Sequence, residues 1–154
     1  MKYKKGIALL VTMITVSALL LISFVVTNIA TKQLILGYSN QESQYAYYNS
    51  NSGVECALYW DLQKNGDPSP FDPYITFPTN ISCNSHTVTF NSPPPIISGY
   101  STTTFQVDLP KGCVILDVVK KVGLSTTTKI ESRGYNTCTA GALRRFERGI
   151  KIVY

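Results

Sequence analysis

An uncharged segment of 26 residues near the start of the chain, Gly6 through Thr31, constrains the fold more than any other feature. A helix rises about 1.5 Å per residue, so this segment reaches about 39 Å and exceeds the ~30 Å hydrocarbon core of a bilayer. The basic residues Lys2, Lys4 and Lys5 precede it. Because cytoplasmic flanks of membrane spans are rich in lysine and arginine, we expect a single-pass protein with its N-terminus in the cytoplasm and the rest outside.

Helical spacing continues beyond this segment. Positions three or four residues apart define one face: Leu34, Tyr38, Gln41, Tyr45, Tyr48, Ser52, Cys56, Tyr59 and Leu62. The dipeptide Asn65-Gly66, followed by prolines, predicts the end of the helix. We therefore expect a transmembrane helix at 7–36 that continues as an amphipathic helix at 37–64, and the amphipathic part needs an apolar partner.

Five segments in which apolar residues alternate predict strands: 86–90, 103–109, 113–121, 125–133 and 145–154. Turns and short loops separate them, which is typical of an antiparallel sheet. This sheet is the apolar partner that the chain offers to the amphipathic helix. The predicted fold is therefore α+β: a long N-terminal helix packed on a small antiparallel β-sheet head that occupies residues 65–154.

The four cysteines, Cys56, Cys83, Cys113 and Cys138, are widely spaced, and the sequence has one histidine, His86. Structural zinc sites usually have closer ligand pairs, so we expect two disulfides, which require an oxidising compartment. Four cysteines allow three pairings. We favour Cys56–Cys83, which would tie the helix to the following loop, and Cys113–Cys138, which would tie two β segments together.

The formal charge of +5 does not indicate a nucleic-acid-binding domain. Four of the 14 lysines and arginines flank the apolar segment, which leaves ten against nine acids, all beyond residue 40. Arg144, Arg145, Arg148 and Lys151 could meet a phosphate backbone, but a solvated edge paired with nearby acids is the simpler interpretation. The sequence offers no metal-ligand cluster, phosphate-binding loop or nucleophile–base motif, so we expect no catalytic site, metal or cofactor.

The N-terminal segment has three interpretations. A secretory signal peptide would have a shorter apolar core that ends at a small-residue cleavage site, which residues 23–32 do not provide. A plain single-span anchor is the second, and its head would bind a ligand or adhere without polymerising. The third rests on Lys4-Lys5-Gly6 followed by Ile7-Ala8-Leu9-Leu10-Val11, an arrangement similar to the leader that a prepilin peptidase cuts after the glycine.

Nearly the whole chain resembles the type IV pilin-like family. The aromatic–Ala–small–Gly–Glu stretch from Tyr45 to Glu55 is similar to the helix of such proteins, and Ile130-Glu131-Ser132-Arg133-Gly134 before an arginine-bearing final strand is similar to their heads. The likeness is to PilX-type minor pilins and to the glutamate-less tip pseudopilin of type II secretion. It implies a leader at 1–6, cleavage between Gly6 and Ile7, insertion in membrane lipid, and later helix–helix packing with other pilin subunits.

One departure from major pilins is informative. Those proteins have a glutamate at the fifth mature position, which is Val11 here if Ile7 is the first. A carboxylate there can neutralise the terminal amine of a neighbouring subunit, and an unpaired charge in an apolar core is costly. The resemblance thus implies a minor pilin or pseudopilin: a low-copy structural subunit, not an enzyme, held in the cytoplasmic membrane before it reaches a filament or the cell surface.

Overall fold

The computed structural model describes residues 4–62, 69–72, 74, 81–88, 96–123 and 127–154. Its elements are the helix α1 (Lys4–Leu62) and the strands β1 (Ile81–Cys83), β2 (His86–Val88), β3 (Ile96–Ile97), β4 (Tyr100–Asp108), β5 (Cys113–Lys121), β6 (Thr128–Tyr135) and β7 (Glu147–Val153). The chain divides into two compact units, Met1–Asn40 and Gln41–Tyr154. We call the second unit the head; it includes the part of α1 from Gln41 to Leu62.

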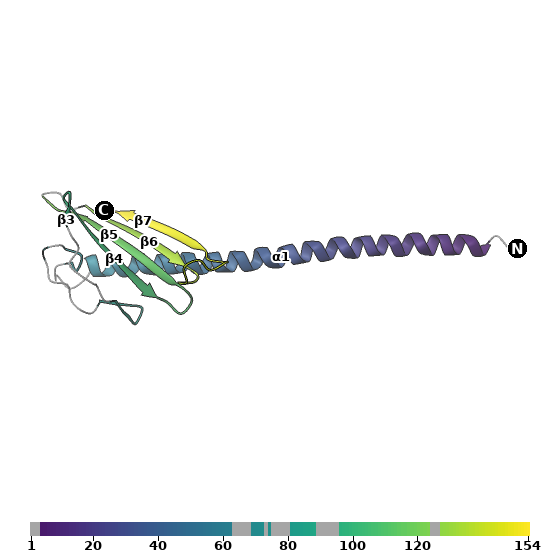
Figure 1. The fold of residues 1–154 in the computed structure, drawn as a ribbon, viewed down its shortest axis with the longest axis horizontal. Helices are drawn as coiled ribbons and strands as arrows, with labels where there is room; N and C mark the ends of the chain where they lie inside the picture. The colour runs from purple at the N-terminus through teal and green to yellow at the C-terminus, as the bar shows by residue number, and fades with distance from the viewer. Residues whose placement is uncertain (1–3, 63–68, 73, 75–80, 89–95, 124–126) are drawn as a thin grey trace. The chain divides into compact units, whose positions relative to one another are not determined.

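Strands β3 to β7 form a five-stranded antiparallel sheet in which each strand pairs with its neighbours in sequence (Figure 1). Burial alternates strictly along β4, so a slip of one residue would expose its apolar set, and the register is fixed. Strands β1 and β2 form a separate hairpin, whose turn residues Asn84 and Ser85 both have positive φ, the conformation that two-residue hairpins favour. The predicted α+β fold, a long helix with an antiparallel sheet, is confirmed.

The predicted strand boundaries agree with the structure to different degrees. The strand expected at 113–121 is β5 at both ends, and those expected at 103–109 and 145–154 are β4 and β7 with shifted ends. Residues 89–90 and 125–126, expected in strands, lie outside the described residues, as does the expected helix end at 65–66. The short strands β1 and β3 were not predicted, because two or three residues give no alternation to detect.

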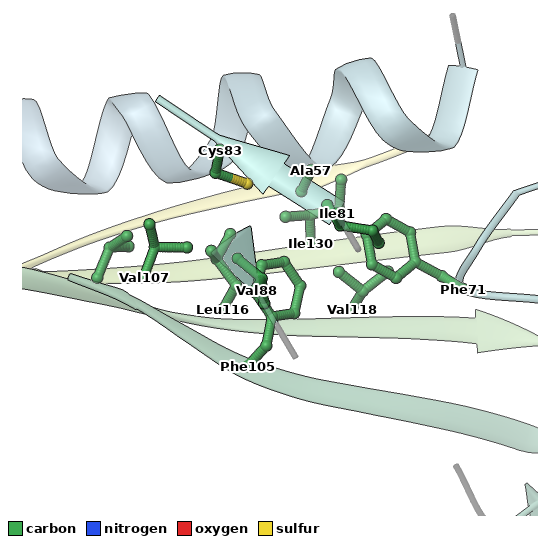
Figure 2. Close-up of a cluster of buried hydrophobic side chains, with 11 residues drawn as sticks. Ala57, Phe71, Ile81, Cys83, Val88, Phe105, Val107, Leu116, Val118 and Ile130 are labelled. Carbon is green, nitrogen blue, oxygen red and sulfur yellow. The ribbon is translucent and has the colours of Figure 1, made fainter. Parts of the chain in front are cut away.

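The hydrophobic core of the head lies between α1 and the sheet (Figure 2). Its buried members are Ala57, Phe71, Ile81, Cys83, Val88, Phe105, Val107, Val114, Leu116, Val118 and Ile130. The rings of Phe71 and Phe105 stack with centroids 5.7 Å apart. Burying one large apolar side chain contributes about 1.5–3 kcal/mol, so this cluster supplies the main driving force for folding of the head.

The helix face that packs on the sheet is not the one predicted. Tyr48, Tyr59 and Leu62 of the predicted face are 64%, 54% and 63% exposed. The buried positions of α1 in the head are mostly small: Ala46, Ser50, Gly53, Val54 and Ala57. The prediction was wrong because it placed the largest apolar side chains against the sheet, where the two backbones lie too close to admit them.

Candidate functional site

The predicted cleavage site lies in the first turns of α1. A Cβ added at Gly6 would meet no heavy atom within 4 Å, and Ile7 is 66% exposed. Lys4 and Lys5 begin the helix, and Lys2 lies outside the described residues. Among the described residues, none covers the side-chain position of Gly6. Cleavage after Gly6 stays a prediction.

The helix that follows presents its apolar residues to the surroundings. Each Val, Leu, Ile, Met and Phe side chain from Ile7 to Leu36 is at least 51% exposed. A window of 18 residues has a mean hydropathy of 2.7, and among the described residues α1 is the helix long and apolar enough to cross a membrane, by length and composition. Contiguous apolar surface of this extent marks contact with lipid or with other protein.

Five hydroxyl side chains within this apolar segment have partners inside the helix itself. The hydroxyls of Thr12, Thr15, Ser17, Thr27 and Thr31 donate hydrogen bonds of 2.8–3.1 Å to carbonyls three or four residues earlier. Hydrocarbon offers no partner for a hydroxyl, so such internal bonds are what a helix in lipid requires. These residues are therefore compatible with a span.

Helix and sheet meet most closely at Gly134 of β6. A Cβ at Gly134 would stand 2.1 Å from the carbonyl oxygen of Ala46 and 2.4 Å from the amide nitrogen of Ser50. Beside it, the Ser50 hydroxyl donates to the Ser132 carbonyl at 2.9 Å, and the Ser132 hydroxyl donates to the Ser50 carbonyl at 2.8 Å. Two of the stretches on which the family resemblance rests, 45–55 and 130–134, thus contact each other.

A side-chain amide on α1 holds the β4–β5 loop and the end of β6 at one end of the sheet. The Asn49 amide donates to the carbonyls of Lys111, at 2.7 Å, and of Tyr135, at 2.8 Å. Gly112, with a φ of 95°, lets the β4–β5 hairpin pass next to Tyr135, because a Cβ there would lie 2.0 Å from the Tyr135 carbonyl oxygen. The Lys111 ammonium donates to the Tyr45 hydroxyl at 2.9 Å, which lowers the pKa of that phenol.

At the other end of the head, Asp61 joins three parts of the chain. Its carboxylate accepts hydrogen bonds from the hydroxyls of Ser69 and of Tyr154, the latter at 2.5 Å, and pairs with the Lys120 ammonium at 2.5 Å. The side chain of Asp61 is 2% exposed. Burial alone would raise the pKa of this carboxyl, but the three donors outweigh it and the pKa is lowered.

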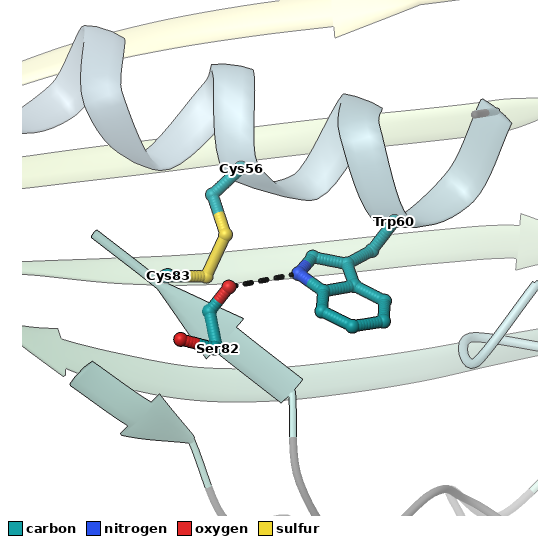
Figure 3. The surroundings of a disulfide bond; sticks show 4 residues. All are labelled: Cys56, Trp60, Ser82 and Cys83. Atoms are coloured by element: carbon teal, nitrogen blue, oxygen red, sulfur yellow. Dashed lines mark hydrogen bonds between the residues drawn. A yellow bond between two sulfur atoms is a disulfide. The ribbon is translucent and has the colours of Figure 1, made fainter. Parts of the chain in front are cut away.

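One of the two predicted disulfides is confirmed. Cys56 of α1 is bonded to Cys83 of β1, with the two Cα atoms 5.7 Å apart (Figure 3). One helical turn further along, the Trp60 indole donates to the Ser82 carbonyl at 3.1 Å. These two links fasten the β1–β2 hairpin to the helix.

The second expected disulfide, Cys113–Cys138, is not formed in the structure, where both residues are thiols. Their sulfur atoms and a carboxylate oxygen of Asp108 all lie within 4.8 Å of one another, and the Cys138 thiol points to Asp108 Oδ1 at 3.8 Å. Burial first, and the neighbouring Cys138 second, raise the pKa of the Cys113 thiol to about 12. The expectation that these two cysteines are neighbours therefore agrees with the structure, whereas the bond expected between them is not formed.

The basic stretch before and within β7 interacts only partly with acids. Lys151 pairs with Glu131 at 3.9 Å, as expected. The Arg145 guanidinium instead lies 3.9 Å from the centre of the Tyr135 ring, and Arg148 Nε donates to the Ser43 hydroxyl at 2.8 Å. The prediction of a charge-paired edge thus holds for the lysine and is wrong for these two arginines.

Comparisons with known proteins do not identify a family for this chain, so its class is judged from the architecture alone. The sequence matches no protein-family model, and no curated protein or solved structure shows significant similarity to it. A long N-terminal apolar helix, whose later part packs on an antiparallel sheet, is nevertheless a pilin-like architecture.

Several residues that hold α1 against the sheet were not predicted from the sequence. Asn49 and Ser50 belong to the run Asn49-Ser50-Asn51-Ser52-Gly53, which is unusual inside a helix because such residues disfavour it. That run was the available signal for a close helix–sheet contact. Nothing in the sequence marked Asp61 as a structural residue. Its partners Ser69, Lys120 and Tyr154 are scattered along the chain and form no recognisable motif.

Proposed function

We propose that this protein is a minor pilin or pseudopilin, a low-copy structural subunit of a type IV pilus-like or secretion filament and not an enzyme. It is inserted in the cytoplasmic membrane, with the head outside, before assembly. A prepilin peptidase removes residues 1–6, and Ile7 becomes the mature N-terminus. The segment 7–36 then exchanges lipid contacts for contacts with the helices of other subunits.

One observation supports this proposal above the others: the apolar side chains of 7–36 are exposed, while the head has a core of its own. The segment therefore serves something outside the chain, either lipid or other helices. Assembly in a filament uses both in turn. Helix association in lipid depends on close packing, so the small residues Ser17 and Gly37 help neighbouring helices to approach, and Gly37 has nothing within 4 Å of a Cβ placed on it.

The low copy number follows from the fifth mature position. Val11 is 51% exposed, and no acidic residue lies between Gly6 and Thr31. An assembled copy cannot offer a carboxylate there to the terminal amine of a neighbour, and a buried unpaired ammonium is costly at every interface where it recurs. If the protein occupies only the end of a filament, an unpaired terminal ammonium occurs there once at most.

The competing function is a single-span surface protein whose head binds a ligand and never polymerises. Gold-labelled antibody against the head separates the two. We expect labels on sheared filaments, few per filament and concentrated at one end. Uniform labelling along the filament would contradict the low-copy role, and label confined to the cell envelope would favour the surface protein.

A further inference from the structure

Two cysteines and an aspartate meet at the end of the sheet where β4 turns into β5. Asp108 ends β4 and Cys113 begins β5, and the two residues are direct partners in the register of these strands, whereas Cys138 comes from the segment between β6 and β7. The two sulfur atoms and one carboxylate oxygen all lie within 4.8 Å of one another. The sequence showed no metal-ligand cluster because these residues come from three segments that only the fold brings together.

The cluster lies on the face of the sheet that points away from the hydrophobic core. Burial alternates along β4, with Val107 in the core and Asp108 exposed on the opposite face. Cys113 is paired directly with Asp108, so the two side chains share that outer face. Cys113 is nevertheless buried, whereas Asp108 and Cys138 are exposed. An ion can therefore reach the cluster from solvent through the two exposed side chains.

Hydrogen bonds hold the exposed members of the cluster in place. Two residues before Cys138, the Asn136 backbone amide donates to the Phe146 carbonyl at 3.3 Å, and the Phe146 amide donates to Asn136 Oδ1 at 2.7 Å. The Gln106 side-chain amide donates to Asp108 Oδ1 at 2.7 Å and so orients the carboxylate. Metal ligands in proteins are commonly oriented by partners of this kind.

The ligand types and their spacing fit a tetrahedral zinc ion. Zinc binds thiolate sulfur at about 2.3 Å and carboxylate oxygen at about 2.0–2.2 Å, so two such ligands on one ion are about 3.5–3.8 Å apart. Cys138 Sγ and Asp108 Oδ1 are already 3.8 Å apart, and the limit of 4.8 Å for the other pairs requires only a small closure of the side chains. Two thiolates exclude calcium and magnesium, which take oxygen ligands.

The charges around the cluster favour a dication over a bond between the two sulfurs. Burial first, then Cys138 and the Asp108 carboxylate, raise the pKa of the Cys113 thiol. The carboxylate thus opposes the thiolate with which disulfide formation begins, and it contributes nothing to a finished disulfide. A dication makes all three groups useful as ligands. Arg145, whose charge also acts on Cys113, then balances the remaining negative charge of two thiolates, one carboxylate and a dication.

We propose that Asp108, Cys113 and Cys138 bind one zinc ion. Two S–H bonds break and two zinc–sulfur bonds form, both protons go to solvent, and no electron is transferred. A water molecule fills the fourth position. The ion ties the β4–β5 hairpin to the segment after β6, as the Cys56–Cys83 disulfide ties the β1–β2 hairpin to α1. The inference goes beyond the proposed function and depends neither on membrane insertion nor on filament assembly.

Cobalt(II) is a suitable probe, because it occupies zinc sites and its bonds to thiolate absorb light. The full-length protein is extracted in detergent under argon without reductant, so that the Cys56–Cys83 disulfide stays closed. Added cobalt should produce a thiolate-to-cobalt charge-transfer band that saturates at one ion per chain. Zinc should then displace the cobalt and remove the band.

Single substitutions test each ligand separately. Cys138→Ser should halve the band intensity per bound cobalt, because one of two cobalt–sulfur bonds is lost. Asp108→Asn should keep the intensity per bound ion and weaken binding, and Gln106→Leu, which removes the amide that orients the carboxylate, should weaken binding about 10–100-fold. Glu55→Gln neutralises an exposed carboxylate on α1 and is the matched control, which should bind cobalt as the unsubstituted protein does.

Thermal unfolding gives a second readout that does not depend on colour. A ion that binds the folded head and not the unfolded chain raises the unfolding midpoint. Zinc should therefore raise the midpoint of the unsubstituted protein and leave that of Cys138→Ser unchanged. In the presence of a chelator, the two proteins should unfold at the same temperature.

Two results would overturn the zinc site. The first is a protein with alkylatable thiols at Cys113 and Cys138 that gives no charge-transfer band with cobalt. The second is freshly extracted protein in which peptide mapping finds Cys113 bonded to Cys138, which would assign the pair to the disulfide expected from the sequence. Both results leave the proposed function untouched, because leader cleavage and filament labelling test that separately.

Discussion

The apolar segment 7–36 and the head satisfy their polar and apolar groups in opposite ways. In the segment, hydroxyls bond to carbonyls three or four residues away and apolar side chains face outward. In the head, apolar side chains are buried, and polar groups bond across long stretches of sequence, as Ser50 and Ser132 do over 82 residues. The segment thus needs an apolar environment to be stable, whereas the head provides its own.

This difference predicts where substitutions will be tolerated. A small residue in the segment has open space around it, and its role depends on what packs there later. A small residue in the head lies against another element, and the fold depends on its size. Matched substitutions in the two regions therefore test whether they differ in packing in this way.

The largest effect is expected from adding one methyl group at Gly134. In Gly134→Ala the new Cβ would overlap backbone atoms of Ala46 and Ser50, which cannot move independently of the helix. We expect the free energy of unfolding of the head to fall by about 3 kcal/mol or more, as for severe overpacking. Gly37→Ala, the same change in open space, should leave it unchanged. Urea unfolding in detergent measures both, and equal effects would show that the two regions do not differ in packing.

Removing the disulfide should have the next largest effect. Cys56 and Cys83 are separated by 27 residues, for which the chain-entropy relation gives about 3.5 kcal/mol at 25 °C. The double variant Cys56→Ser, Cys83→Ser should lose a stability of this order. Cys138→Ser, which alters an exposed thiol, is the control and should change stability by less than about 0.5 kcal/mol. A double variant as stable as the control would mean that the β1–β2 hairpin is held without the covalent link.

A smaller loss is expected at Asn49. Asn49→Ala leaves the carbonyls of Lys111 and Tyr135 without their side-chain donor and should lower the free energy of unfolding by about 1–3 kcal/mol. Asn51→Ala removes an amide whose bond to Glu55 lies on the exposed side of the same helix, so it should cost much less. Hydrogen exchange at the β4–β5 hairpin should accelerate in the first variant only; unchanged exchange there would argue against Asn49 as its support.

The smallest effect is expected from the titration of Asp61. The folded pKa of Asp61 lies below its unfolded value of about 3.9, so its stabilisation is complete above that pH and is lost as pH falls through the folded pKa. Asp61→Asn should flatten this acid limb of the stability curve. Asp72→Asn, in the neighbouring turn, serves as the control. An unaltered acid limb in Asp61→Asn would assign the acid sensitivity of the head to other carboxylates.

The sequence predicted the features that depend on composition and periodicity. The uncharged segment, the antiparallel sheet and the limits of β5 follow from local patterns, and the Cys56–Cys83 pair agreed with the idea that the helix is tied to the next segment. The face of α1 that meets the sheet could not be found in this way, because the largest hydrophobic residues do not mark it. Only the distance between two backbones, set by Gly134, explains why Ala46 and Ser50 occupy that face.

Features that depend on three-dimensional proximity were equally inaccessible. The carboxylate of Asp61 has partners at positions 69, 120 and 154, and no sequence spacing brings these together. The cysteine pair 113 and 138 is a different case, because the two residues were correctly expected to be neighbours but are two thiols in the structure. Contacts between residues distant in sequence cannot be predicted until the fold is known.

The mature N-terminus distinguishes a pilin-like subunit from a plain membrane anchor, because the helix of a pilin-like subunit must lose its leader and a plain anchor need not. Intact-mass measurement of the protein recovered from membranes and from sheared filaments locates this end. For a pilin-like subunit we expect a chain that begins at Ile7. We also expect that Gly6→Glu keeps the leader and abolishes recovery from filaments, whereas Gly37→Ala is processed normally. A chain in filaments that retains Met1 to Gly6 would contradict the proposed role as a processed pilin-like subunit.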